Sequence, residues 1–291
     1  MWDTFLVVEN YPEEDTRSRV EELHTCGGGE TATAMRALAR WGVASRLIGR
    51  VGQDDAGRHI REALGADGVD ISRLDTVPGA PTRQSFIVVN RATGMRTVFS
   101  TTPATVAMRA GEVDGTMLDG VSLLHLDGSH GPAALELARE AHRRGIPLML
   151  DASRTPPQIE ELMALADYLV ADAAFALAFT GLEGAEGVRA LHRERPRTLT
   201  AATFGLAGCH AVLADGTTLH QPAFSISPAV DTTGAGDLFH AAVDFGIVRG
   251  WPIGRTLRWA SAAGALACRA LGSQGGIPSA AEVDALGGGA E

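Results

Sequence analysis

The chain has 291 residues, 45% of them hydrophobic, and a formal net charge of −10 with a pI near 5.4. This acidic balance argues against a nucleic-acid partner and against an anionic membrane surface, since both require a basic footprint. Small metabolites remain as the expected ligands. The 25 basic residues are all arginine, which excludes the P-loop motif Gly-Lys-Ser/Thr and any Schiff-base mechanism.

No run of about 18 apolar residues occurs, and the N-terminus is not a basic region followed by an apolar one. We therefore expect neither a membrane span nor a signal peptide. Cys26, Cys209 and Cys268 are too few and too scattered for a disulfide framework or a metal cluster. A cytoplasmic protein is expected.

The first third of the chain mixes extended runs with helices. The predicted elements, in order, are an extended run over 2–8, a second around 17–24, a helix from the glycines at 27–29 to Trp41-Gly42, a strand over 45–48, a turn beginning at Gly49 and a helix over 56–64. The spacing of Gly27-Gly28-Gly29 does not fit Gly-x-Gly-x-x-Gly, so this is not a dinucleotide fingerprint.

Two β-rich runs, 82–90 and 96–100, are separated by the short segment 92–95, which is the signal of a hairpin. Together with the extended runs near 5–9 and 17–24, they predict a small four-stranded sheet. Alternation leaves one face of this sheet apolar, and a sheet of this size needs something to cover it.

From about residue 112 the pattern becomes regular βα. The predicted strands cover 122–126, 147–150, 168–170 and 198–203, and the helices between the first of them cover 132–143, 157–165 and 173–179. Such alternation predicts a parallel sheet with helices on both faces.

The segment 231–237 reads Asp-Thr-Thr-Gly-Ala-Gly-Asp and precedes a helix that is apolar on nearly all sides. Gly234 and Gly236 let the backbone approach a ligand, and the unpaired N–H groups of the following helix can bind an anion. Asp237 falls in the first turn, where the macrodipole favours its ionised form, so it is a candidate general base. The alternative for these residues is a tight turn with Asp237 as a helix cap.

The segment 231–237 closely resembles the C-terminal signature of the PfkB (ribokinase-like) carbohydrate kinases. The resemblance implies an α/β, ribokinase-like fold with a mainly parallel central sheet, helices on both faces and a small β-sheet lid. It implies a single domain over 1–291, with the lid formed from about 5–25 and 82–100. In that family the glycine-flanked amides bind the transferred phosphoryl group, which assigns catalysis to Gly234, Ala235, Gly236 and the base Asp237.

Other segments extend the resemblance. Residues 26–34 are similar to the N-terminal signature, with Thr33 in place of the family's Asn, and 203–208 resembles the nucleotide loop Thr-x-Gly-x-x-Gly, although a plain hairpin turn is the alternative. The implied substrate-binding residues are Asp3, Arg17, Gly28, Gly29, Thr33 and Asp237. The implied ATP-binding residues are Thr203, Gly205, Gly208, Thr232, Gly234 and Gly236.

The chain departs from the family at the Asn-x-x-Glu motif that orders Mg²⁺. Asp172 and Phe175 stand there, and only Asp172 could help. Sulfofructose kinases resemble the chain in this departure, in Gly27-Gly28-Gly29 and in 220–224, and ketohexokinase resembles it around Asp3. The similarity around Asp3 also suggests that the first strand of the central sheet is mostly absent, which would leave Asp3 on a loose terminus.

The resemblance implies an ATP- and Mg²⁺-dependent sugar kinase that phosphorylates a primary hydroxyl of a ketose-type sugar such as sulfofructose or fructose, and a homodimer through the lid. One alternative is a nucleoside kinase of the same fold, which the aromatic content of 5% disfavours. The other is a catalytically impaired sugar sensor, suggested by Thr33 and Phe175 and opposed by the intact Asp237.

Overall fold

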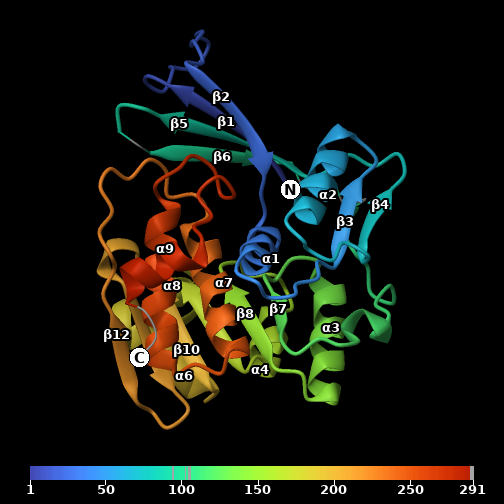
Figure 1. Cartoon of the computed structure of the whole chain (residues 1–291), viewed down its shortest axis with the longest axis vertical. Helices are drawn as coiled ribbons and strands as arrows, with labels where there is room; N and C mark the ends of the chain where they lie inside the picture. The colour runs from blue at the N-terminus through green and yellow to red at the C-terminus, as the bar shows by residue number, and fades with distance from the viewer. Residues whose placement is uncertain (94, 102, 104–105, 289–291) are drawn as a thin grey trace. The chain divides into compact units, whose positions relative to one another are not determined.

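The computed structural model of the chain describes residues 1–93, 95–101, 103 and 106–288. They divide into two units. The first comprises Met1–Ala107, Ile226–Ala235 and Leu266–Pro278, and the second contains the other described residues. Figure 1 labels the helices and strands of both. A single ribokinase-like domain over 1–291 stays a prediction.

The first unit contains the predicted four-stranded sheet, in the order β2-β1-β5-β6. Its strands are β1 (Trp2–Val8), β2 (Glu22–Gly27), β5 (Gln84–Asn90) and β6 (Arg96–Ser100). β1 pairs antiparallel with β2 and parallel with β5, and β5 pairs antiparallel with β6. β2 begins later than predicted, because residues 17–21 are polar or exposed and have no apolar face to bury. Gly94, in the predicted hairpin turn, lies outside the described residues.

The two faces of this sheet differ in burial. On one face Phe5, Val7, Ile87 and Val89 form a buried cluster, against which Cys26 and Leu271 pack. On the other face the aligned pair Phe86 and Phe99 is 40% and 58% exposed, and Leu23, aligned with Leu6, is 65% exposed. The period of two in a strand sends alternate side chains to opposite faces. One apolar face therefore remains uncovered within the described chain.

The remaining elements of the first unit are α1 (Glu30–Arg40), α2 (Asp55–Ala66) and a two-stranded parallel sheet of β3 (Gly49–Gly52) and β4 (Leu74–Val77). The predicted strand over 45–48 is wrong, since only Arg46 makes an isolated bridge there. The glycines at 49 and 52 suggested a turn. Gly52 instead lies in a strand. The backbone of residues 80–82 passes so close to it that any side chain would collide, which explains the glycine at this position.

The second unit contains a six-stranded sheet in the order β12-β11-β10-β9-β8-β7. Its strands are β7 (Leu124–Leu126), β8 (Leu148–Ala152), β9 (Tyr168–Asp172), β10 (Leu199–Thr203), β11 (Cys209–Leu213) and β12 (Thr218–Gln221). β7 to β10 are parallel, and β11 and β12 add an antiparallel edge. All five residues of β8 are buried, as expected for a strand covered by helices on both faces. The predicted mainly parallel sheet is confirmed.

The first helices of this unit alternate with strands β7 to β10, and three consecutive helices follow β12 (Figure 1). They are α3 (Gly131–Arg144), α4 (Ile159–Leu165), α5 (Ala173–Thr180), α6 (Gly184–Glu194), α7 (Ala235–Val248), α8 (Ile253–Ala267) and α9 (Ala280–Gly287). In α7 every residue from Leu238 to Gly246 is buried, as its apolar sequence predicts. Among the described residues, no helix combines the length and the apolar character that crossing a bilayer requires.

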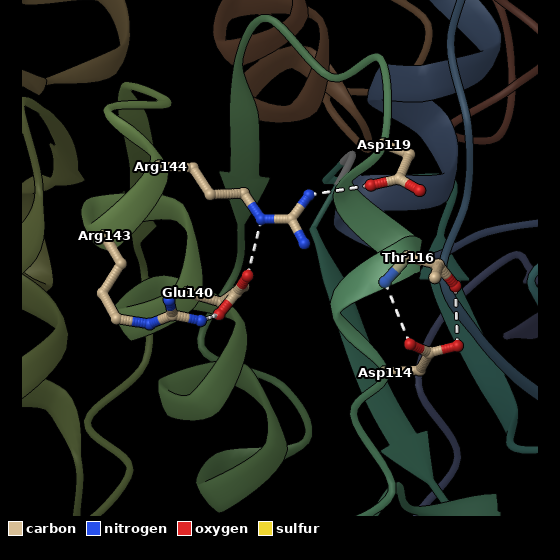
Figure 2. A network of polar contacts seen from close by, with 6 residues as sticks. All are labelled: Asp114, Thr116, Asp119, Glu140, Arg143 and Arg144. Atoms are coloured by element: carbon tan, nitrogen blue, oxygen red, sulfur yellow. Dashed lines mark hydrogen bonds and ion pairs between the residues drawn. The ribbon is translucent and has the colours of Figure 1, made fainter.

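Figure 2 shows how the short helix η2 (Gly115–Leu118) is held beside α3. Arg144 donates from Nε to Glu140 on its own helix at 2.5 Å and from Nη1 to Asp119 at 2.8 Å. Asp114 caps η2, because its carboxylate accepts from the backbone N–H two residues later at 3.0 Å. Exposed ion pairs of this kind contribute little stability each. Their effect is to orient the segment that leads into β7.

Candidate active site

The buried carboxylate of Asp231 accepts hydrogen bonds that fix the glycine-rich segment 231–237. Asp231 accepts at Oδ1 from the backbone N–H and the hydroxyl of Thr233, at 3.0 and 2.8 Å. Its Oδ2 accepts from Gly272 N–H at 2.9 Å. One side chain therefore fixes the turn and fastens it to the segment that follows α8.

The two glycines of the segment have different surroundings. Gly234 has φ +83°, and a Cβ there would lie 2.6 Å from Ser273 Cα, so no other residue fits without moving backbone. A Cβ on Gly236 would meet nothing within 4 Å. Packing inside the chain thus requires glycine at 234, whereas the space beside 236 is open to a ligand.

Asp237 lies in the first turn of α7 and is half-buried. The helix dipole favours a negative charge at this end of the helix. The carboxylate also acts on His240, one turn later, since it contributes to raising the pKa of that imidazole against the lowering effect of burial. The sequence prediction of a carboxylate in the first turn is confirmed, and its catalytic role remains a proposal.

Asp3 forms a second carboxylate site, in the first unit. It lies in β1, aligned with Cys26 and Ser85 on the neighbouring strands, and is 2% exposed. Burial raises the pKa of Asp3 to about 6. A Cβ on Gly28 would lie 2.5 Å from Asp3 Cγ, so Gly28 is the residue that makes room for this carboxylate. The expected loose terminus is not observed for Asp3.

Thr33 is fully buried in α1 and lies beside Gln274. Gln274 Nε2 donates to Thr33 Oγ1 at 3.4 Å, and its Oε1 accepts from Arg36 at 2.7 Å. A Cβ on Gly27 would lie 2.5 Å from that same oxygen. An amide from the C-terminal part of the chain therefore stands next to the hydroxyl at position 33.

Several polar atoms of the first unit are buried without a hydrogen-bond partner among the described residues. They are Asp3 Oδ1, His24 Nε2, Arg83 Nε and Ser273 Oγ. Buried polar groups in folded proteins are paired in the great majority of cases, so such atoms indicate a place where a ligand or water completes the pairing. The positive charge of Arg83 lowers the pKa of the Asp3 carboxyl, and so opposes part of the rise that burial causes.

Thr232, next to the turn, is contacted by the four-stranded sheet. Arg96 at the start of β6 donates from Nη1 to Thr232 Oγ1 at 2.7 Å. Thr232 immediately follows Asp231. The segment 231–233 is therefore fixed both by Arg96 of the four-stranded sheet and by the Asp231 carboxylate.

The segment 203–208 connects antiparallel strands β10 and β11 through the 3-10 turn η3 (Gly205–Ala207). Phe204 N–H donates to Gly208 O at 2.8 Å and closes the loop. Gly208 has φ +86° and packs against the backbone of residues 221–223, which leaves no room for a side chain, whereas Gly205, at φ +55°, has open space around it. The loop is thus a hairpin connection whose tip is accessible to a ligand.

Comparisons with known proteins agree with this architecture. A model of the pfkB family of carbohydrate kinases matches residues 1–280. The chain belongs to the pfkB family of carbohydrate kinases. It is therefore an ATP-dependent kinase that uses a carbohydrate hydroxyl as acceptor.

Individual relatives cover nearly the whole kinase. The ATP-dependent ribose-1-phosphate kinase of Halopiger xanaduensis is 30% identical over 91% of this chain and 88% of its own length. Mouse ketohexokinase is 27% identical over 94% of this chain and 95% of its own length. The crystal structure of a putative ribokinase from Agrobacterium tumefaciens superposes with a TM-score of 0.91 at 27% identity, covering 98% of this chain and 94% of that one. These likenesses confirm the ribokinase-like fold.

Two sequence predictions about the kinase gain no geometric support. Arg17 lies in the exposed segment 9–21 between β1 and β2, and within the described chain no hydrogen bond or ion pair joins it to Asp3 or Thr33. Asp172 caps α5, accepting from Phe175 N–H at 2.6 Å, while the Phe175 side chain is buried. The described residues contain no group of three side chains suited to hold a metal.

Several contacts in this kinase join residues that lie far apart along the chain, and local sequence patterns do not predict them. Gln274 stands beside Thr33, Ser273 beside Gly234, and Arg96 beside Thr232. The composition of 272–278 indicates a loop, and it carries no information about which segment that loop contacts.

Proposed function

We propose that the kinase transfers the γ-phosphoryl group of ATP to a primary hydroxyl of a ketose-type sugar such as fructose or sulfofructose, with Asp237 as general base. The observation that carries the proposal is the position of Asp237, in the first turn of a buried helix directly after Gly234-Ala235-Gly236. The helix dipole and the N–H groups of the first turn make this end of α7 suitable for a phosphoryl group, although Ala235 N–H also donates to Thr232 O at 3.3 Å.

In the proposed reaction the Asp237 carboxylate takes the proton of the sugar hydroxyl as its oxygen attacks the γ-phosphorus. The bond to the β–γ bridging oxygen breaks, and ADP leaves with the electron pair. The amides of residues 234–236 stabilise the charge on the transferred group. Mg²⁺ would enter with ATP, and we assign it no step.

Asp3 is proposed to bind a sugar hydroxyl. Its buried Oδ1 has no partner in the described chain, and a carboxylate is an acceptor for a hydroxyl hydrogen. Thr33 with Gln274 offers a hydroxyl and an amide for the same class of ligand. Gly28 and Gly29 would allow close approach, and Arg17 remains the proposed contact for an anionic group on the sugar.

ATP is proposed to contact Thr203, Gly205, Gly208 and Thr232 as well as Gly234 and Gly236. Support comes from the accessible tip of the 203–208 loop and the open space beside Gly236. The three cysteines are free, which agrees with a cytoplasmic location.

A homodimer through the four-stranded sheet is proposed, in which that sheet acts as a lid over the sugar. The exposed side chains Leu23, Phe86 and Phe99 lie on one face of the sheet, and a second copy of the same face would bury them.

The test of the proposed base is Asp237→Asn, assayed by ADP release. Turnover should fall by roughly 10²–10⁴, the range for loss of a general base, while the melting temperature and the KM for ATP stay near wild type. Glu186→Gln, which neutralises an exposed carboxylate in the first turn of α6, is the matched control. A variant that keeps more than about half of wild-type turnover would rule out the base.

The acceptor is identified by the same assay with a panel of sugars. Fructose, sulfofructose, 2-keto-3-deoxygluconate, ribose, ribose 1-phosphate and nucleosides would be compared by kcat/KM. A preference for a ketose supports the proposal. A preference for ribose, its 1-phosphate or a nucleoside contradicts the substrate class and leaves the kinase activity intact.

A further inference from the structure

Four ionisable side chains are buried together in the second unit. We call them the His-Asp quartet: His125 on β7, Asp151 on β8, and His240 and Asp244 on α7. Their side chains are 4%, 2%, 6% and 1% exposed, respectively. Charged groups are almost never buried so fully unless they are paired.

The quartet consists of two pairs that lie side by side. His125 Nδ1 is hydrogen-bonded to Asp244 Oδ2 at 2.6 Å. His240 Nδ1 lies 3.0 Å from Asp151 Oδ2, an ion-pair distance without hydrogen-bond geometry. The two imidazole rings meet edge to face, with centroids 6.5 Å apart. The pairs thus connect two neighbouring strands of the sheet with one face of α7.

The carboxylates favour the protonated form of the two histidines. Burial alone lowers the pKa of His125, but attraction to Asp244, with Asp151 and Asp127, raises it to about 9. Burial also lowers the pKa of His240, whereas Asp151 and Asp237 raise it, and His125 opposes them. The net direction of the pKa is upward for both, so the carboxylates favour the imidazolium form of each histidine.

His240 is the member of the quartet nearest to the proposed base along the helix. Residues three apart lie on the same face of a helix, about 5–6 Å apart at Cβ. Asp237 is accordingly among the carboxylates that act on His240. Electrostatic interaction is mutual, so the His240 imidazolium stabilises the Asp237 carboxylate in return.

We propose that His240, held by Asp151, is a positioning residue that keeps the base Asp237 ionised and fixes the first turn of α7 against β8. This inference rests on the proposed function. A half-buried carboxylate that faces a polyanionic substrate is driven toward its protonated form, in which it cannot accept a proton. A fixed cation one turn away opposes that effect.

The decisive variant is His240→Asn, whose amide is polar but carries no charge. The pH profile of kcat would be measured by ADP release between pH 5 and 9 with saturating sugar and ATP. The acidic limb should move up by about one pH unit, as expected when a unit charge is removed at this range. At a pH on the acidic limb of both enzymes kcat should fall about tenfold, and at pH 8.5 it should stay within about twofold of wild type, with both KM values little changed.

Two further variants complete the design. Asp151→Asn removes the carboxylate that holds the imidazolium, and it should move the acidic limb in the same direction. His192→Asn is the matched control, because His192 is buried in the same unit but bonds only to Thr200 Oγ1, at 3.0 Å, and no carboxylate raises its pKa. Its acidic limb should coincide with that of wild type.

A merely structural role for His240 predicts a different result, a uniform loss of kcat and a lower melting temperature with the acidic limb in place. That outcome, together with an inactive Asp237→Asn, would overturn the inference and leave the base intact. An active Asp237→Asn would instead refute the base itself. Should the variants fold poorly, NMR of the imidazole nitrogens in wild type decides, since a neutral His240 at pH 7.5 would contradict the inference.

Discussion

Folding stability should fall as the pH rises from 6.5 to 9, because of the buried pair His125–Asp244. The pKa of His125 is about 9 in the folded protein, compared with an ordinary value of 6.5. A histidine whose pKa is raised by folding contributes its full stabilisation below the unfolded value and loses it as the pH rises through the folded value. The predicted window therefore lies between these two pH values.

The size of the effect follows from the shift. One pKa unit corresponds to about 1.4 kcal/mol, so the rise from 6.5 to about 9 corresponds to about 3 kcal/mol. This is a large part of the net stability of about 5–15 kcal/mol that is typical of folded proteins. The pKa of His240 is raised as well, so it adds to the loss in the same direction.

The measurement is urea unfolding of the kinase at several pH values from 6 to 9, followed by far-UV circular dichroism. The scan stops at 9 because burial raises the pKa of Cys26 to about 11 and of Cys209 to about 12 from 9.0, so both thiols add their own losses above that pH. His192 and His210 do not interfere. Burial lowers the pKa of each, so they change the free energy of unfolding only below pH 6.5.

His125→Asn is the variant that isolates the pair. It should be less stable than wild type at pH 6.5, and its stability should change much less between pH 6.5 and 9. A wild-type free energy of unfolding that stays constant within about 0.5 kcal/mol over this range would refute the role of the His125–Asp244 pair. The same change with pH in His125→Asn as in wild type would refute it too.

Two further predictions concern the sugar site and the sheet. Gly28→Ala should raise the KM for sugar at least about tenfold in steady-state kinetics and leave the KM for ATP within about twofold, because the new Cβ would collide with the Asp3 carboxylate. The control is Gly65→Ala, whose Cβ would meet only Ile71 at 3.7 Å. An unchanged KM for sugar would argue against Asp3 as a ligand. The double variant Phe86→Glu, Phe99→Glu should sediment as a monomer at micromolar concentration while wild type and Leu206→Glu, altered at a 92% exposed loop residue, sediment as dimers. A monomeric wild type would contradict the dimer.

Much of the fold follows from local patterns that a sequence carries by itself. The alternation of apolar strands with helices after residue 112 predicts the parallel part of the second sheet, because strands buried on both faces are continuously apolar. The helix after Asp237 is buried as its composition predicts. The motif at 231–237 is contiguous, so its glycine turn and first-turn carboxylate can be located without a structure.

Local patterns fail where glycine serves packing. The prediction placed a strand over 45–48 and a turn from Gly49, because glycines suggest a loop. The strand is Gly49–Gly52, and Gly52 is the residue that allows the backbone of residues 80–82 to approach. α6 has no counterpart among the predicted elements, since Gly184 and Gly187 weaken helix propensity in its first turn. Packing of Val188 and Leu191, both fully buried, outweighs that propensity.

Only the tertiary structure decides which distant side chains meet. Gln274 reaches Thr33 across 241 positions, and Asp244 reaches His125 across 119. Each of these side chains has many possible partners in the sequence, and none is marked by spacing. Hydrogen bonds and charge pairs form at separations of about 3 Å, so they depend on the packing of whole strands and helices. That packing brings His125 to Asp244 and Asp151 to His240.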